Sequence, residues 1–245
     1  MPDLNNRVAL VTGGSRGIGK AIALALAGAG AAVAVNYRER GEDAGAVVEA
    51  IVTSGGRAAA FGADVSLRSA VQSMADEVQE RLGPIDILVN NAGMAAMRGL
   101  DDITEEDFDR GIATNLKSAF LCTQAVLPSM RRRRWGRIVN ISSIGARVGA
   151  GSVSVVYGAA KAGLEGLTRG YALRLAPEGV TVNAIAPGLV DTDMGKPLIE
   201  AGVPARIPVG RAGTGDEIAQ AVLLLVRNAF MTGQTIAVNG GALFS

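Results

Sequence analysis

A tyrosine and a lysine four residues apart are the strongest candidates for proton transfer in this chain. They are Tyr157 and Lys161, and two serines, Ser142 and Ser143, lie upstream of them. Side chains at positions i and i+4 share one face of a helix, so a helix here brings the two together. A tyrosine ordinarily titrates near pH ~10, and a neighbouring ammonium favours its charged form. On spacing alone, a packed tyrosine with a surface lysine is the commoner arrangement.

A glycine-rich segment near the start of the chain has the composition of a phosphate-binding turn. It reads Thr-Gly-Gly-Ser-Arg-Gly-Ile-Gly over residues 12–19 and lies between a predicted strand and a predicted helix. Glycines permit a tight turn and let backbone N–H groups approach a pyrophosphate, which the N-terminus of the helix also attracts. An ordinary glycine-rich turn is the alternative, but the position after the first strand favours a dinucleotide site.

The end of the second predicted strand bears on which dinucleotide is bound. It reads Asn36-Tyr37-Arg38, without the acidic residue that an NAD site places against the ribose 2′-hydroxyl. Arg38 and Arg16 have instead the charge and shape to bind a 2′-phosphate, although both could be solvated surface residues. We therefore expect NADP(H) to be preferred over NAD(H).

The composition excludes several other kinds of chemistry. The 245 residues carry a net charge of +1 and include no histidine, so histidine acid–base catalysis and Ser-His-Asp triads are excluded. Cys122 is the single cysteine, which excludes an intrachain disulfide. We expect Cys122 to lie in the core, and we expect the protein to have no metal site. Because the charge is balanced, we interpret Arg131–Arg134 as a helix end rather than a nucleic-acid patch, and the acids of residues 101–107 as a helix start.

No segment of the sequence has the pattern of a signal peptide or a membrane span. The first residues lack a basic region followed by an apolar stretch, and the longest nearly apolar run, Ala21–Val35, is short and rich in glycine. We expect a cytoplasmic protein without a membrane partner.

Short apolar runs alternate with longer stretches of helical periodicity over the whole chain, which predicts a doubly wound α/β fold with one parallel sheet. The predicted strands are Val8–Val11, Ala32–Tyr37, Ala58–Phe61, Ile85–Asn90, Arg137–Ile141, Val180–Ile185 and Thr235–Val238. The predicted helices are Ile18–Gly28, Gly41–Ser54, Leu67–Leu82, Glu105–Arg133, Val155–Ala176 and Asp216–Val226.

We expect residues 1–245 to form a single domain, because no linker or shift in composition divides them. Two helix starts carry capping signals, Thr104 with Asp107 and Thr214 with Glu217. The segment 189–213 contains Pro197, Pro204 and Pro208 and is predicted to be a loop or short-helix lid.

Taken in order along the chain, these motifs resemble the short-chain dehydrogenases/reductases. The resemblance rests on residues 12–19, Asn90-Asn91-Ala92-Gly93, Asn115, Ser143, Tyr157 with Lys161, and Pro187-Gly188. It is strongest for the subgroup of 3-oxoacyl-[acyl-carrier-protein] reductases, through residues 180–188 and 238–241. The resemblance implies a Rossmann-like fold with a seven-stranded parallel sheet and helices on both faces.

The resemblance also implies a role for each residue of a catalytic set. Tyr157 would donate a proton to a substrate carbonyl oxygen as hydride arrives from the nicotinamide, and Ser143 would hydrogen-bond that oxygen. Lys161 would lower the pKa of Tyr157 and hold the nicotinamide ribose, and Asn115 would support a proton-supplying water chain. The coenzyme would contact Gly13, Ser15, Arg16, Gly17, Ile18, Gly19, Tyr37, Arg38, Asp64, Val65, Asn91, Ala92, Gly93, Tyr157, Lys161, Pro187, Gly188, Val190 and Thr192.

The implied activity is NADP(H)-dependent reduction of a ketone to a secondary alcohol, with a 3-oxoacyl thioester as substrate. Where such reductases often carry arginines that dock acyl carrier protein, this chain has Pro128 and Leu173, although Arg131–Arg134, Arg169 and Arg174 lie nearby. That partner therefore stays open, and free ketones, sugars or acyl-CoA thioesters are alternative substrates. A cofactor-binding regulatory protein is the non-enzymatic alternative.

Two predicted helices, Glu105–Arg133 and Val155–Ala176, carry more apolar residues than one sheet face requires. Exposed apolar surface of this kind favours oligomerisation. The family commonly pairs these helices in dimers and the last strand in tetramers, so we expect a homotetramer.

Overall fold

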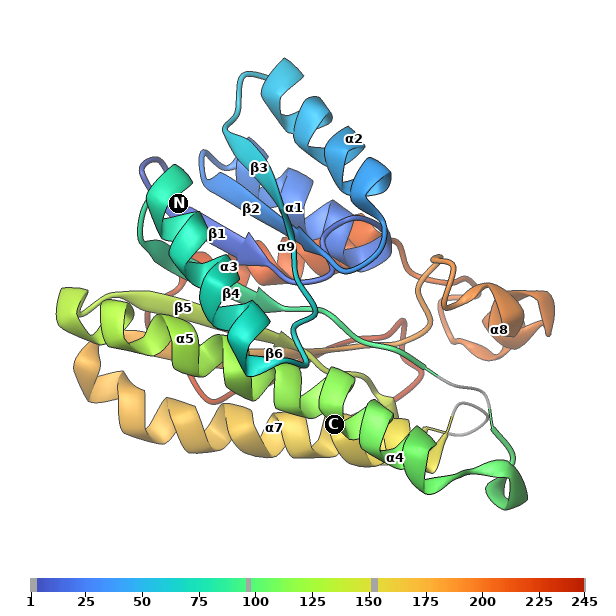
Figure 1. Cartoon of the computed structure of the whole chain (residues 1–245). Helices are drawn as coiled ribbons and strands as arrows, with labels where there is room; N and C mark the ends of the chain where they lie inside the picture. Colours follow the sequence, from blue (N-terminus) through green and yellow to red (C-terminus); the bar gives the residue numbers. More distant parts are fainter. Residues whose placement is uncertain (1–3, 96–97, 151–153, 245) are drawn as a thin grey trace.

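Seven parallel strands form one sheet in the computed structural model, which describes residues 4–95, 98–150 and 154–244 (Figure 1). The strand order is β3-β2-β1-β4-β5-β6-β7, so the direction of winding reverses between β1 and β4. In such sheets, ligands bind beyond the carboxyl ends of the strands at that reversal. The predicted fold class is confirmed. The strands are β1 (Val8–Val11), β2 (Ala32–Tyr37), β3 (Ala58–Gly62), β4 (Ile85–Asn90), β5 (Gly136–Ile141), β6 (Val180–Pro187) and β7 (Thr235–Val238).

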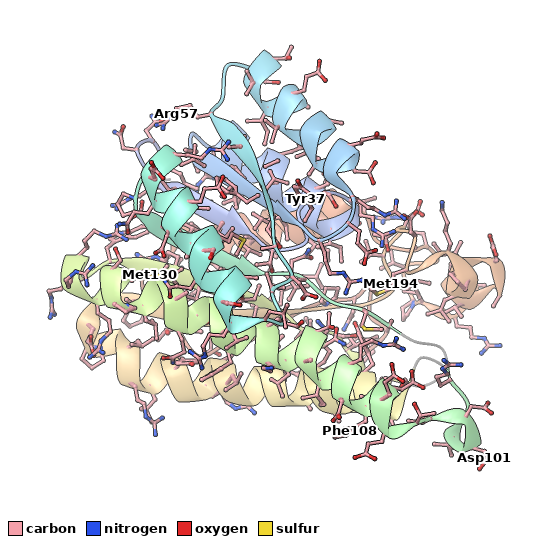
Figure 2. The ribbon with its side chains drawn as sticks, viewed as in Figure 1. Tyr37, Arg57, Asp101, Phe108, Met130 and Met194 are labelled. Atoms are coloured by element: carbon pink, nitrogen blue, oxygen red, sulfur yellow. The ribbon has the colours of Figure 1, made fainter. Side chains whose placement is uncertain are left out.

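Helices cover both faces of the sheet, and alternate strand residues supply the two cores. Val11 and Val35 pack under one set of helices, whereas Leu10 and Ala34 pack under the other. Met130, labelled in Figure 2, is fully buried between its helix and the sheet. The first set is α1 (Gly17–Gly28), α2 (Gly41–Thr53) and α9 (Gly215–Arg227), and the second is α3 (Arg68–Arg81), α5 (Ser118–Arg133) and α7 (Val155–Leu175) (Figure 1).

The long helix predicted over Glu105–Arg133 is interrupted. It consists of α4 (Glu105–Ile112), a π-helical turn at Ala113–Lys117, and α5. Within the turn, the Asn115 side-chain amide donates to the Gly111 carbonyl oxygen at 3.0 Å. The side chain thereby supplies a hydrogen bond to a carbonyl oxygen one turn back in the helix. The wider π turn would otherwise leave that carbonyl without a partner. Helical periodicity does not distinguish a π turn from regular helix, so this interruption was not predicted from the sequence.

Side chains fix where the functional helices begin. The capping boxes predicted for α4 and α9 are both present: Thr104 accepts from the Asp107 N–H, and Thr214 accepts from the Glu217 N–H. Helix α7 begins after Ser154, whose hydroxyl accepts from the Val156 N–H at 3.2 Å. These caps satisfy N–H groups in the first turn of each helix and so fix where it begins.

The segment predicted to be irregular, 189–213, contains the short helix α8 (Lys196–Glu200) and a 3₁₀ turn at Val203–Arg206 (Figure 1). Its two ends are joined, because Val190 and Gly213 form a parallel bridge. A further short helix, α6 (Gly145–Val148), follows β5.

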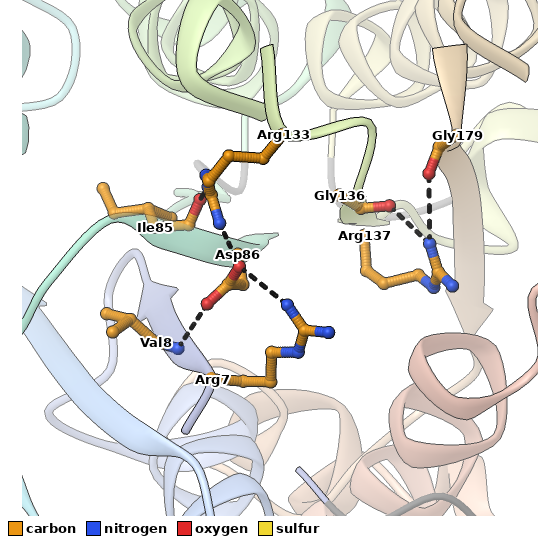
Figure 3. Close-up of polar contacts among 8 residues, drawn as sticks. All are labelled: Arg7, Val8, Ile85, Asp86, Arg133, Gly136, Arg137 and Gly179. Carbon is orange, nitrogen blue, oxygen red and sulfur yellow. Dashed lines mark hydrogen bonds and ion pairs between the residues drawn. The ribbon is translucent and has the colours of Figure 1, made fainter. Parts of the chain in front are cut away.

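The amino-terminal edge of the sheet is held by an acid between two arginines (Figure 3). Asp86, on β4, is only 3% exposed. Its carboxylate accepts hydrogen bonds from Arg7 at 3.2 Å, from the Val8 N–H at 3.0 Å, and from Arg133 at the end of α5. The acid therefore ties β1, β4 and α5 together at this edge.

Arg137 lies at the same edge and is buried, and no acid among the described residues pairs with it. Its guanidinium donates to the carbonyl oxygens of Val226, Gly136 and Gly179, and it stacks on Trp135 at 4.5 Å from the ring centroid. Val226 lies in the last turn of α9, where the helix dipole is negative, so the helix end stabilises the buried cation.

The run Arg131–Arg134 lies at the C-terminal end of α5, as predicted, but three of its four side chains bind partners. Arg131 pairs with Glu178, Arg133 with Asp86, and Arg134 donates to the Pro177 carbonyl oxygen at 2.8 Å. This part of the molecule is the edge opposite to the carboxyl ends of the strands, as Figure 1 shows for the two ends of α5.

Cys122 is buried in the core, as expected, and burial raises the pKa of its thiol to about 12. The thiol is therefore uncharged and unreactive near neutral pH. In the part of the chain that the structure describes, no helix combines the length and the apolar composition needed to cross a membrane.

Candidate active site

The glycine-rich segment forms the turn between β1 and α1, as its composition predicts. Gly13 and Gly17 have φ angles of 61° and 53°, in the left-handed region that favours glycine. A Cβ at Gly19 would overlap the Gly13 carbonyl oxygen. The three glycines therefore let the loop fold back over the first turn of α1 with its backbone exposed.

Three polar side chains at the ends of neighbouring strands hold this loop, and two of them, Asn36 and Thr12, were quoted within sequence motifs but not assigned to the site. Asn36, at 2% exposure, accepts from the Gly13 N–H and donates to the Phe61 and Ala63 carbonyl oxygens. The Thr12 hydroxyl accepts from the Asn91 and Ala92 N–H groups. The only sequence signal for Asn36 was a polar residue in an otherwise apolar strand.

Asn91 was expected to lie along a coenzyme, but its side chain has a structural task. It donates to the Thr12 and Gly13 carbonyl oxygens at 2.9 and 3.0 Å. The end of β4 is therefore tied to the glycine-rich loop after β1 across the point where the sheet reverses its winding.

The four residues of the predicted catalytic set are brought together at the carboxyl ends of the strands. Ser143 follows β5, and its hydroxyl is close enough to Tyr157 on α7 to act against the rise in the Tyr157 pKa that burial causes. One turn further along α7, the Lys161 ammonium lies 5.6 Å from the centroid of the Tyr157 ring. Lys161 is 4% exposed and donates to the Ile141 carbonyl oxygen at 2.7 Å.

Asn115 joins this cluster through Gly93. A Cβ placed on Gly93 would lie 2.8 Å from the Asn115 Oδ1 atom and 3.5 Å from the Lys161 Nζ atom, so only glycine fits between them. The Asn115 amide also holds Met94, because it donates to the Met94 carbonyl oxygen at 2.9 Å and accepts from its N–H at 3.0 Å. The π-helical turn therefore supports the loop that follows β4, next to Lys161.

Burial dominates the electrostatics of the tyrosine and lysine. It raises the pKa of Tyr157, and the hydrogen bond with Ser143 offsets only part of that rise. Burial also lowers the pKa of Lys161 to about 8. The pKa of Tyr157 is therefore raised rather than lowered as expected, because burial outweighs the groups around the phenol. Tyr157 keeps its proton at neutral pH.

The turn at the start of α1 fits an anionic dinucleotide. Helix α1 begins after Arg16 without a side-chain cap on its first N–H groups and without an acid in its first turn. Uncapped N–H groups at a helix N-terminus attract phosphate. Gly17, in the loop, and Gly93, beside Lys161, are both exposed and carry no side chain that would cover the backbone. Residues present here can therefore hold a pyrophosphate and a ribose.

Residues at the ends of β2 and β3 lie where the adenosine of such a ligand is expected. Tyr37 packs against Gly62: a Cβ there would lie 3.2 Å from the Tyr37 hydroxyl oxygen. Burial opposes ionisation of Asp64, but hydrogen bonds from Ser66 and the nearby Arg38 outweigh it and lower the Asp64 pKa. Arg38 also forms a 2.7 Å ion pair with Glu39, an acid just beyond the residues considered in the sequence.

Residues after β6 complete this side of the site. The Pro187 carbonyl oxygen accepts from the Ile144 N–H at 3.0 Å, which ties the end of β6 to the turn that carries Ser143. Gly188 approaches Asn239 closely, since a Cβ there would lie 2.9 Å from the Asn239 Cα atom. Thr192 packs against Gly17, so the start of segment 189–213 reaches the glycine-rich loop.

Comparison with known proteins gives a consistent family. The model of the family described as "Enoyl-(Acyl carrier protein) reductase" matches residues 13–242. The 3-oxoacyl-[acyl-carrier-protein] reductase FabG of Staphylococcus epidermidis is 44% identical over 242 residues, covering 96% of this chain and 98% of the relative. A 3-oxoacyl-[acyl-carrier-protein] reductase of Synechocystis is 43% identical over 245 residues, covering 98% of each chain.

Solved structures agree with the sequence relatives. A crystal structure of an Agrobacterium tumefaciens protein, proposed to be a gluconate dehydrogenase, is 35% identical and superposes with a TM-score of 0.93 over 99% of this chain and 98% of that one. The match extends through both the glycine-rich loop and the Ser143, Tyr157 and Lys161 cluster. The chain therefore belongs to the short-chain dehydrogenase/reductase family of oxidoreductases.

Proposed function

We propose that this protein is an NADP(H)-dependent carbonyl reductase that acts on a 3-oxoacyl thioester. The observation that carries the proposal is the position of Ser143, Tyr157 and Lys161 beside the glycine-rich turn, at one edge of the sheet. A proton donor and a dinucleotide site at the same edge are what carbonyl reduction requires.

In this proposal, Tyr157 and Ser143 both donate hydrogen bonds to the substrate carbonyl oxygen. Because burial raises the pKa of Tyr157, the hydroxyl is protonated at neutral pH and is a proton donor for reduction. A nicotinamide coenzyme supplies the hydride when it is bound. Lys161 holds the ribose hydroxyls, and its charge stabilises the tyrosine oxygen once the proton has left.

In this proposal, Asn115 positions other parts of the site and does not contact the substrate. Its amide hydrogens are given to Gly111 and Met94, so its side chain fixes the π-helical turn next to Lys161. Along that turn we expect the water chain that returns a proton toward Tyr157.

The NADP(H) preference rests on the two arginines near the expected adenosine. Arg38 lies close enough to Asp64 to lower its pKa, which puts a guanidinium beside the adenosine end of the site. Arg16 flanks the start of α1. Guanidinium groups match the geometry and charge of a 2′-phosphate. Equal binding of NADPH and NADH to the purified protein would contradict this preference.

The proposed substrate class follows the curated relatives, which are named for 3-oxoacyl-[acyl-carrier-protein]. Docking of acyl carrier protein itself has less support, because three of the four arginines at the end of α5 are engaged with Glu178, Asp86 and Pro177. A free ketone or sugar is therefore the second candidate substrate, and the similarity to a proposed gluconate dehydrogenase favours it.

The deciding experiment follows NADPH absorbance with a 3-oxoacyl group on acyl carrier protein, the same group on a small thiol, and simple ketones and sugars. We expect the thioesters to be reduced fastest. The variant Tyr157→Phe should lose about 10²- to 10⁴-fold in rate, because the proton donor is removed, while its Kd for NADPH stays unchanged. Wild-type rates in this variant would contradict the role of Tyr157.

The same assay tests the non-enzymatic alternative. NADPH binding without oxidation by any member of the panel would favour a cofactor-binding regulatory protein. The cluster of Ser143, Tyr157 and Lys161 argues against that outcome, since a binding-only protein has no need of a buried lysine beside a tyrosine.

We further propose a homotetramer and a substrate lid at residues 189–213. Phe108 and Leu173, on α4 and α7, are 48% and 78% exposed, and Phe230 and Phe244, flanking β7, are 98% and 86% exposed. Large exposed side chains on two separate surfaces fit two kinds of subunit contact. Sedimentation as a monomer at micromolar concentration would contradict the tetramer. The cytoplasmic location stays a prediction from the sequence.

A further inference from the structure

One of the two arginines expected to bind a 2′-phosphate is joined to an acid in the segment 189–213. The Arg16 Nη1 atom, in the glycine-rich loop, lies 2.7 Å from the Asp193 Oδ2 atom. Lys196, the first residue of α8, lies 3.3 Å from the other oxygen of the same carboxylate. Asp193 is next to Met194, which Figure 2 labels, at the turn that leads into α8.

Backbone contacts hold Asp193 at this position. Asp191 donates its N–H to the Gly213 carbonyl oxygen, and Gly195 and Lys196 donate theirs to the Thr192 carbonyl oxygen. The Thr192 methyl group also lies against Gly17. The carboxylate is therefore carried on a closed turn that packs directly on the loop, and its approach to Arg16 follows from the backbone.

A carboxylate at this place affects the binding of an anion. The Arg16 guanidinium attracts phosphate, and an acid paired with that guanidinium weakens the attraction. Arg16 and Asp193 are each about half exposed, at 51% and 52% of their side-chain surface, so solvent moderates the interaction without removing it. A phosphate monoester carries a charge of about −1.5 to −2, and so competes well with a carboxylate for a guanidinium.

We propose that Asp193 is a specificity-determining residue, which limits the preference for NADP(H) over NAD(H) by competing with the 2′-phosphate for Arg16. This inference rests on the proposed coenzyme. NADH has no 2′-phosphate, so it binds with the Arg16–Asp193 ion pair intact. NADPH must share Arg16 with Asp193 or release it, and release loosens the contact between the glycine-rich loop and the turn before α8.

The test is a double-mutant cycle on coenzyme binding. The Kd values of NADPH and NADH are measured by nicotinamide fluorescence, without substrate, for wild type, Asp193→Asn, Arg16→Gln and the double variant. We expect Asp193→Asn to tighten NADPH binding about two- to fivefold, the range that an exposed ion pair supports, and to leave the Kd of NADH within error. In the Arg16→Gln background, Asp193→Asn should change neither Kd.

The matched control is Glu200→Gln, which removes the same charge from the other end of α8. It should change neither Kd, whereas a general effect of net charge would tighten NADPH binding in both variants. Higher ionic strength should reduce the difference between Asp193→Asn and wild type, because both the ion pair and the phosphate contact are exposed.

Different outcomes separate this inference from the proposed function. Equal tightening of NADPH and NADH by Asp193→Asn, or tightening that persists in the Arg16→Gln background, would overturn the role of Asp193 and leave the NADP(H) proposal standing. Failure of wild-type protein to bind NADPH at all would overturn both. Circular dichroism of each variant checks that the fold is retained.

Discussion

Two buried charged side chains at opposite edges of the sheet, Asp86 and Lys161, have opposite surroundings. At the amino-terminal edge, Asp86 is paired with Arg7 and Arg133 and also accepts from a backbone N–H (Figure 3). At the carboxyl edge, Lys161 is equally buried, but within the described residues no carboxylate pairs with it, and its hydrogen bond goes to the Ile141 carbonyl oxygen.

We interpret the charge of Asp86 as one that stabilises the fold, and the charge of Lys161 as one that binds a ligand. Removing a buried charge that has good partners lowers the stability of the protein, because the partners are then left unpaired in the interior. A buried charge without a counter-ion lowers the stability of the free protein, and sites of this kind are commonly functional. The comparison therefore predicts opposite effects on stability when each charge is removed.

The largest effect is expected from Asp86→Asn. The substitution leaves Arg7 and Arg133 without their acid, and should lower the free energy of unfolding by about 3–5 kcal/mol, the usual result of breaking a buried pair. Denaturant titration measures the loss. Asp109→Asn, on the exposed side of α4, is the matched control and should be neutral. A loss under about 1 kcal/mol for Asp86→Asn would remove the distinction between the two edges.

A smaller effect of opposite sign is expected from Lys161→Met. Burial lowers the Lys161 pKa from its ordinary 10.5 to about 8, so near pH 7 the charged form destabilises the folded state. The variant should be about 1–3 kcal/mol more stable than wild type at pH 7, although we expect it to lose the proposed activity. Lys20→Met, at an exposed position of α1, controls for the change in composition.

The pH dependence of the same variant sharpens this prediction. Between pH 8 and 10.5 the unfolded chain binds more protons at Lys161 than the folded chain does, so this group makes wild-type stability rise with pH in that window. The advantage of Lys161→Met over wild type should therefore shrink as the pH rises toward 10.5. A constant difference from pH 7 to 10.5 would mean that Lys161 is not the group responsible.

The smallest effect is expected from Glu178→Gln, which removes the acid from the exposed pair with Arg131. Solvent and salt screen such pairs, so the midpoint of thermal unfolding should not change measurably. A decrease comparable to that of Asp86→Asn would show that burial does not explain the contrast between the two edges.

Much of the fold could be predicted from the sequence, since the alternation of strand and helix patterns specifies a parallel sheet. The seven predicted strands match the observed ones to within two residues, and the capping signals of α4 and α9 mark their starts. The π-helical turn around Asn115 was not predicted. The local pattern of apolar residues does not show which carbonyl groups in a distant loop need a hydrogen-bond donor.

For the candidate site, sequence alone determined which residues are present and in what order: a glycine-rich turn, Ser143, and Tyr157 with Lys161 on one helical face. Only the tertiary structure decided how they meet and what their surroundings do to them. Asn36 and Asn91 lock the loop from other strands, burial sets the pKa of Tyr157 and Lys161 in opposite directions, and Asp193 reaches Arg16 from far along the chain. The reason is physical: desolvation and ion pairing depend on which segments pack together, and spacing along the chain does not record that.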